Sequence, residues 1–161
     1  MTADAATVTG ELVGQAIVVR LGSGRFAVPM TNVAEVGRVP SLTRVPGLPS
    51  WVAGAANWRG RIMPVLDLRL LLGAHTAHAE RSSRILVLAT ASATVGLLVD
   101  EVLATTVIAS DEMAAFPASL PVAAAGLLGG QLARSDGPVA VLDVDAVMRL
   151  RETLPRGRRT A

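Results

Sequence analysis

The 161-residue chain contains no cysteine, no tyrosine and no lysine. Without cysteine, disulfide bonds, thiolate nucleophiles and cysteine-based metal sites are excluded, which fits a reducing cytoplasm. Because every basic residue is arginine, the net charge stays near +2 over a wide pH range, although the calculated pI is about 10.9. A nearly neutral chain of this kind is not typical of nucleic-acid-binding proteins.

Aromatic residues are almost as scarce, with two tryptophans and two phenylalanines in the whole chain. Single-stranded nucleic acids bind to platforms of several exposed aromatic side chains, which this composition does not provide. Apolar residues nevertheless make up 51% of the sequence, chiefly alanine, valine and leucine. Small branched side chains of this sort favour tightly packed barrels over wide ligand cavities.

The sequence also gives no sign of a leader or a membrane span. Its first residues lack a basic region followed by an apolar one, so no signal peptide is expected. The longest uncharged run, 113–133, is long enough to cross a bilayer. Two prolines and three glycines interrupt it, so we expect no transmembrane helix.

The most informative segment is 54–73, which predicts two short strands joined by a tight turn at Arg59-Gly60. Asp67 follows the second strand and is expected to cap a short helix, 68–72, that Gly73 ends. A weaker copy of this unit spans 132–148. It has its turn at Ser135-Asp136-Gly137, its capping residue at Asp143 and a helix over 144–151.

The segments before these units resemble each other as well. Residues 17–29 and 84–99 each read as two apolar runs around a turn of small residues. The alignment pairs Phe26 with Val95, Glu35 with Glu101, and Asp67 with Asp143. We therefore interpret the chain as a duplicated all-β unit. The predicted strands are 16–21, 25–29, 35–39, 53–58, 61–66, 84–90, 93–99, 102–108, 126–133 and 138–142, with long loops at 42–49 and 111–125.

Candidates for chemistry are few. His75 and His78 lie in the segment between the repeats with no third ligand beyond Glu80, so a solvated linker is favoured over a metal site. Asp100 and Glu101 are neighbours on a strand and point to opposite faces, so they are expected to cap or to lie at a solvated rim. Gly22-Ser23-Gly24 is a hairpin turn rather than a phosphate-binding loop.

Four segments together resemble a known family, the CheW adaptors of bacterial chemotaxis and the related regulatory domain of the CheA histidine kinase. They are Arg44-Val-Pro-Gly47, Asn57-Trp-Arg-Gly60, Pro64-Val-Leu-Asp-Leu-Arg69 and Gly96-Leu-Leu-Val-Asp100. The resemblance runs from about Ala16 to about Arg151. Trp58 stands where the family usually has leucine, and the hairpin at 135–137 replaces a more variable one.

The resemblance implies a mainly β fold of two SH3-like five-stranded barrels from an internal duplication, with short helices. We expect a flexible arm over 1–14, a CheW-like domain over 15–152 and a flexible arginine-rich tail over 153–161. The first barrel is expected at about 16–73 and the second at about 84–151.

It also implies a non-catalytic adaptor, without cofactor or metal, that couples chemoreceptors to a CheA-type kinase. Such a protein works in the cytoplasm and is recruited to membrane-associated receptor arrays. The alternatives are an adaptor of another chemosensory pathway, such as twitching motility or second-messenger control, and a ligand-binding barrel or enzyme. The last would need a pocket of converging polar groups.

By the same resemblance, the receptor is expected to bind in the groove between the two barrels, at Val33, Glu35, Gly54, Arg59 and Gly96. Arg59 precedes the turn glycine, so its guanidinium should project from a hairpin end. Whether it contacts a partner or pairs with Glu35 stays open. Kinase binding is expected at the stiff apolar loop and its flank (Leu42, Val45, Leu48, Trp51), which could instead plug the end of a barrel.

Overall fold

The computed structural model describes residues 12–72, 81–115 and 126–155. Ten strands and one α-helix make up most of these segments. Most of the expected N-terminal arm, His75, His78 and most of the arginine-rich tail lie outside the described residues, whereas 12–14 of the expected arm belong to the first strand. In order, the elements are β1 (Leu12–Leu21), β2 (Gly24–Pro29), η1 (Met30–Asn32), β3 (Val33–Arg38), β4 (Val52–Trp58), β5 (Arg61–Leu66), β6 (Arg84–Ala89), β7 (Thr94–Val99), β8 (Glu101–Ala109), η2 (Ser110–Glu112), β9 (Leu128–Leu132), β10 (Val139–Leu142) and α3 (Val144–Glu152).

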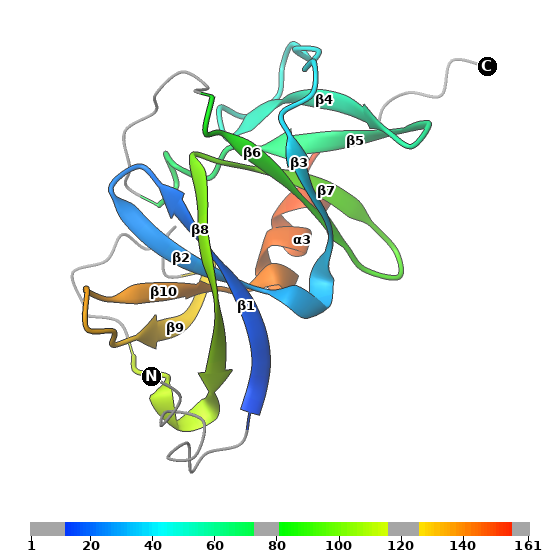
Figure 1. Cartoon of the computed structure of the whole chain (residues 1–161). Helices are drawn as coiled ribbons and strands as arrows, with labels where there is room; N and C mark the ends of the chain where they lie inside the picture. Colours follow the sequence, from blue (N-terminus) through cyan, green and yellow to red (C-terminus); the bar gives the residue numbers. More distant parts are fainter. Residues whose placement is uncertain (1–11, 73–80, 116–125, 156–161) are drawn as a thin grey trace.

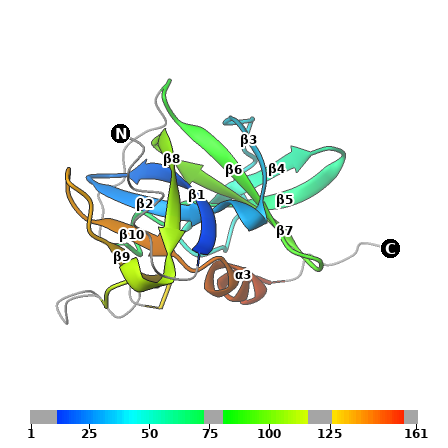
Figure 2. The same ribbon diagram turned by 60° about the horizontal axis from the view of Figure 1, so that its bottom comes forward.

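The strands form two five-stranded sheets, which confirms the mainly β fold class. Sheet A has the order β8-β1-β2-β10-β9 and sheet B the order β3-β6-β7-β5-β4. All neighbours are antiparallel except β2 with β10 and β5 with β7, which are parallel. Figure 1 shows the two sheets one beside the other, with α3 between them; in Figure 2 the helix lies across their junction.

The two sheets do not follow the two halves of the chain, so the expected division at about 16–73 and 84–151 is wrong. Sheet A takes the hairpin β1–β2 from the first repeat and β8, β9 and β10 from the second. Sheet B takes the hairpin β6–β7 from the second repeat and β3, β4 and β5 from the first. Each repeat has therefore exchanged its first hairpin with the other, and neither half contains a complete sheet.

The pairing registers show how closely the repeats correspond. Val65 pairs with Gly96 in sheet B as Val141 pairs with Ala27 in sheet A, and this register also matches Phe26 with Val95. Asp67 and Asp143 follow equivalent strands, as expected. Glu35 does not match Glu101, because Val33, opposite Leu88, corresponds to Val102, opposite Val19, and both strands contain a bulge directly after these residues. The register instead places Glu35, opposite Val87, at the position of Ala104, opposite Val18.

A short segment after each edge strand closes its sheet into a barrel. Thr43 exchanges two backbone hydrogen bonds of 2.8 Å with Ala55, and Ala114 exchanges two of 3.0 Å with Gln131. The strand residue before each bridge is a glycine, Gly54 or Gly130, with φ of 155°. A Cβ on Gly54 would lie 2.8 Å from the Thr43 carbonyl oxygen, so only glycine lets the closing segment approach.

Strand alternation distributes the apolar side chains among three cores. One face of each sheet lines its own barrel: Val18 and Val141 belong to the core of barrel A, and Val65 and Val87 to that of barrel B. The opposite faces meet at the seam between the barrels, where α3 packs. This seam core is the largest of the three, so the barrels are expected to stabilise each other. Its fully buried leucines are Leu21, Leu66, Leu68, Leu86, Leu88, Leu97 and Leu142.

The helix predicted over 144–151 is confirmed, and the one predicted over 68–72 is not. Asp143 caps α3, accepting a 3.1 Å hydrogen bond from the Ala146 N–H. The equivalent segment of the first repeat makes a single turn, with Leu72 N–H donating to Leu68 O at 2.9 Å. Among the described residues, no helix has the length and apolar character needed to span a membrane.

Candidate functional site

An exposed polar cluster lies where the two edges of barrel B meet. Glu35 on β3 accepts a 2.6 Å hydrogen bond from Trp58 Nε1, at the end of β4. Arg59 Nη2 lies 3.4 Å from the same carboxylate oxygen, and the guanidinium stands 5.1 Å from the centre of the Trp58 ring. Glu35 and Arg59 thus pair with each other, and the Arg59 side chain remains 73% exposed. We call these three residues the Arg59 cluster.

The turn that presents Arg59 is determined locally. Arg59 has φ of 50° and Gly60 φ of 79°, so both occupy the left-handed region that tight hairpins require. Asn57 Oδ1 accepts a 3.0 Å hydrogen bond from the Gly60 N–H and holds the turn. Trp58 packs partly against the core of barrel B. The turn therefore holds Arg59 at the surface, and the Trp58 ring and the Glu35 carboxylate orient its guanidinium.

The other residues expected in a receptor groove have mainly structural surroundings. Val33 packs against the seam core from β3. Gly54 is buried against the closing segment, as described above. Gly96 is buried on β7, where a Cβ would lie 2.5 Å from Ile85 Cδ1 and 3.1 Å from Val65 Cγ2. Of the five residues, Glu35 and Arg59 come together at the surface, and Gly54 and Gly96 keep the barrel tightly packed.

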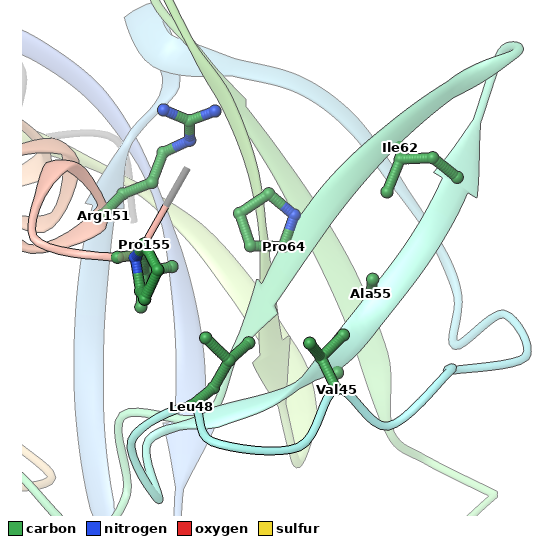
Figure 3. A pocket seen from close by; sticks show the side chains of 9 residues that line it. Val45, Leu48, Ala55, Ile62, Pro64, Arg151 and Pro155 are labelled. Carbon is green, nitrogen blue, oxygen red and sulfur yellow. The ribbon is translucent and has the colours of Figure 1, made fainter. Parts of the chain in front are cut away.

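The four residues expected to bind a kinase divide in a similar way. Leu42 packs against the core of barrel B and Trp51 against the seam core, as a plug of the barrel would. Val45 and Leu48 instead line a surface groove of about 320 Å³ on the outer face of the β4–β5 hairpin. Figure 3 shows this apolar groove. Its lining is Val45, Leu48, Gly54, Ala55, Ile62, Pro64, Arg151, Leu154 and Pro155.

Six residues of the groove lining were not predicted as site residues, among them Ile62 and Arg151. Ile62 is 74% exposed, although it lies inside an apolar strand pattern. Its alternation with the buried Met63 was the available signal for an outward position. Arg151 comes from the far end of the chain, and only the packing of α3 beside β5 brings it to the groove.

A buried ionic network at the seam was also missed. The Arg69 guanidinium donates to Asp67 Oδ2 at 2.7 Å and to Asp100 Oδ1 at 2.8 Å. Asp100 Oδ2 also accepts the Gly22 N–H at 2.7 Å, so the network joins both sheets. The hydrogen bonds with Asp67, supported by both carboxylates, raise the pKa of Arg69 against the effect of burial.

The expected rim position of Asp100 is therefore wrong, because Arg69 supplies a counter-charge that lets it be buried. Asp67 does accept the Arg69 N–H, at 3.1 Å, but its main role is this ion pair. Glu101 lies near the surface and pairs with Arg20 at 3.5 Å. Elsewhere in the described segments, no group of three or more acidic, histidine or cysteine residues is arranged to hold a metal ion.

Comparison with known proteins identifies the family. A family model described as CheW-like domain matches residues 15–152, nearly the whole chain and all of its described elements except the first residues of β1. The chain belongs to the CheW-like family.

Solved and curated relatives agree with this assignment. The crystal structure of the scaffolding protein TtCheW from Thermoanaerobacter tengcongensis superposes with a TM-score of 0.73, at 23% identity, over 81% of this chain and 84% of that one. The chemotaxis protein CheW of Klebsiella aerogenes is 24% identical over 89% of this chain and 87% of its own length. The first likeness shows the shared fold.

Higher identities cover shorter stretches. Protein PilI of Pseudomonas aeruginosa is 41% identical over 52% of this chain and 47% of its own, and protein FrzA of Myxococcus xanthus is 39% identical over 52% of each. These alignments span about half the length of the curated relatives they match. Relatives of this CheW-like chain thus carry several different names.

Proposed function

We propose that this chain is a non-catalytic adaptor that couples chemoreceptors to a CheA-type histidine kinase. The observation that carries the proposal is the pair of exposed surfaces on barrel B in a chain of the CheW-like family. One is the polar Arg59 cluster, and the other is the apolar groove. Two chemically different surfaces on one rigid barrel suit a protein that holds two partners at a fixed distance.

In this proposal the chain works in the cytoplasm, at membrane-associated receptor arrays. The Arg59 cluster meets the cytoplasmic tip of the receptor, with Glu35 and Arg59 in direct contact and Val33 beside them. Gly54 and Gly96 act through the shape of the strands. The apolar groove, with Val45 and Leu48, meets the regulatory domain of the kinase. Leu42 and Trp51 support the loop from inside.

Arg59→Ala tests the receptor surface. Titration with a soluble receptor cytoplasmic fragment should show binding weakened by about tenfold or more, because truncating a desolvated charge contact costs about 2–5 kcal/mol. The melting temperature should hardly move, since an exposed ion pair contributes about 0–1 kcal/mol. Arg149→Ala, at an exposed arginine on α3, is the matched control. Unchanged receptor binding in the Arg59 variant would remove this surface from the proposal.

Leu48→Asp tests the kinase surface. It should abolish binding of the kinase regulatory domain and leave receptor binding within a few-fold, because it places a charge in the apolar groove and leaves the Arg59 cluster intact. Equal loss of both partners, with the fold retained, would show that the surfaces are not separate. A wild-type chain that binds neither partner contradicts the adaptor function itself.

The PilI and FrzA likenesses support a second candidate, an adaptor of the same kind in a different chemosensory pathway. The mechanism is the same and the partners differ. Co-purification from the native cell with mass spectrometry separates the two, through the identity of the kinase and receptor recovered.

A further inference from the structure

The apolar groove combines exposed aliphatic side chains with an unusual excess of positive charge. Ile62 is 74% and Val45 40% exposed. The segment 36–66, which supplies the loop and the β4–β5 hairpin, contains four arginines and no acidic residue. An apolar patch with a one-signed rim is typical of a surface that meets a complementary partner.

Most of these arginines form no ion pair within the part of the chain that the structure describes. Elsewhere Arg20, Arg25, Arg69 and Arg134 each form an ion pair with an aspartate or glutamate. Arg44 and Arg61, next in the chain to Val45 and Ile62, form no ion pair with any described residue. Their positive charge therefore remains available to attract an acidic partner to barrel B.

Arg151 is the charged side chain in the lining of the groove itself. Figure 3 shows it beside Pro155 on one side, with Pro64 between it and the side that holds Ile62, Ala55 and Val45. Its Nε is buried and makes no hydrogen bond within the described part of the chain. A buried, unpaired N–H donor is costly. The Arg151 residue as a whole is only partly buried, and a carboxylate is the acceptor whose geometry matches the remaining donors of a guanidinium.

We propose that the apolar groove binds a protein segment that presents an apolar side chain flanked by carboxylates, and that Arg151 recognises one of these carboxylates. The apolar side chain fills the space between Leu48 and Ile62. Arg44 and Arg61 attract the acidic segment at longer range. This inference rests on the proposed function in taking the occupant to be the kinase regulatory domain, and it specifies the chemistry of the kinase surface.

The test begins with a random peptide library displayed on phage, selected against the full-length wild-type chain. Enriched peptides should combine a large aliphatic or aromatic residue with Asp or Glu. Their binding should fall by about tenfold or more in Arg151→Met and in Leu48→Asp. Arg151→Lys should not restore it fully, because lysine keeps the charge but lacks the planar fork. Arg149→Met is the control and should bind as wild type.

Two further variants keep the test informative if Arg151→Met unfolds. Arg44→Gln and Arg61→Gln change exposed side chains and should each lower affinity a few-fold, mainly through the association rate, with a reduced dependence on salt. Enrichment of peptides without carboxylates overturns the proposal. So does binding that is indifferent to both Arg44 and Arg61.

The same variants are then measured with the purified kinase regulatory domain and with vesicles of phosphatidylglycerol. Kinase binding that ignores Arg151 and Arg44 overturns the inference and leaves the adaptor function standing. Peptide binding as expected, with no kinase binding by the wild type, supports the recognition chemistry of the groove and contradicts the adaptor function. Vesicle binding that depends on Leu48 and the arginines, without peptide enrichment, assigns the groove to a membrane surface and also overturns the proposal.

Discussion

Trp58 in barrel B and Arg134 in barrel A occupy the same position of the repeat, one at the end of β4 and the other just beyond β9. Both reach back to the opposite edge of their barrel. Arg134 donates to the Val107 carbonyl at 3.1 Å and forms an ion pair with Glu112, and its side chain is 28% exposed. Trp58 makes the equivalent link to Glu35. The neighbouring Arg59 is left on the surface.

The outer faces of the β4–β5 and β9–β10 hairpins also differ. Ile62 and Pro64 of barrel B correspond to Pro138 and Ala140 of barrel A. Barrel A therefore uses its cation for closure and has smaller side chains on its outer face. Duplication supplied two equivalent scaffolds, and later divergence placed larger exposed apolar side chains and a free-standing arginine on the β4–β5 hairpin of barrel B.

The largest effect is expected from separating the repeats. Residues 1–80 alone should give no cooperative thermal transition, because β1–β2, β3 and β4–β5 have lost their sheet partners to the other half. Mixing this fragment with residues 81–161 should restore native circular dichroism. A monomeric fragment that melts cooperatively at the temperature of the full chain would contradict the exchange of hairpins.

Losing the buried ion pairs at the seam should destabilise the protein far more than losing a partly exposed ion pair. Arg69→Met leaves Asp67 and Asp100 buried without a counter-charge, and should lower the free energy of unfolding by about 3–5 kcal/mol. Arg20→Met, at the partly exposed pair with Glu101, should cost less than about 1 kcal/mol. Urea denaturation at neutral pH measures the free energy of unfolding of both variants. Similar losses in the two variants would show that the network does not join the barrels.

The equivalent glycines should differ by a smaller margin. Gly130→Ala brings a Cβ within 2.7 Å of the flexible Met113 Cε, whereas in Gly54→Ala the obstacle is the Thr43 carbonyl. Both alanines have unfavourable φ, so we expect a loss of about 1–2 kcal/mol at Gly130 and about 1 kcal/mol more at Gly54. The difference between the urea midpoints of the two variants measures this difference in stability. A larger loss at Gly130 would mean that Met113 cannot move aside.

The smallest effect concerns pH. Burial alone would raise the pKa of Glu112, but hydrogen bonds from Arg134 and the Ala109 N–H lower it below the ordinary value of 4.5. The stabilisation is therefore complete above pH 4.5 and is lost as the pH falls through the folded pKa. Glu112→Gln should remove about 1 kcal/mol at pH 7 and progressively less in acid. Glu152→Gln, at an exposed glutamate, should leave the melting temperature unchanged at every pH.

Much of the local structure followed from the sequence alone. The ten strands lie close to their predicted ranges, because alternation of apolar and polar residues is a local property of a strand. The turn at Arg59-Gly60 and the cap at Asp143 were predictable because their hydrogen bonds join residues within a few positions. The duplication was visible for the same reason. It repeats these local signals in the same order.

Partner choice between distant segments was decided by the tertiary structure. The parallel pairs β2–β10 and β5–β7 join strands from different repeats, and the seam core favours this exchange because it buries both hairpins on two sides. Strand pairing matched Glu35 with Ala104 and not with Glu101, although Glu35 and Glu101 stand in similar local sequences. Asp100 could be buried only because Arg69 reached it, and Arg151 joined Ile62 through the packing of α3. Such contacts depend on the total burial of the folded chain, which no local pattern encodes.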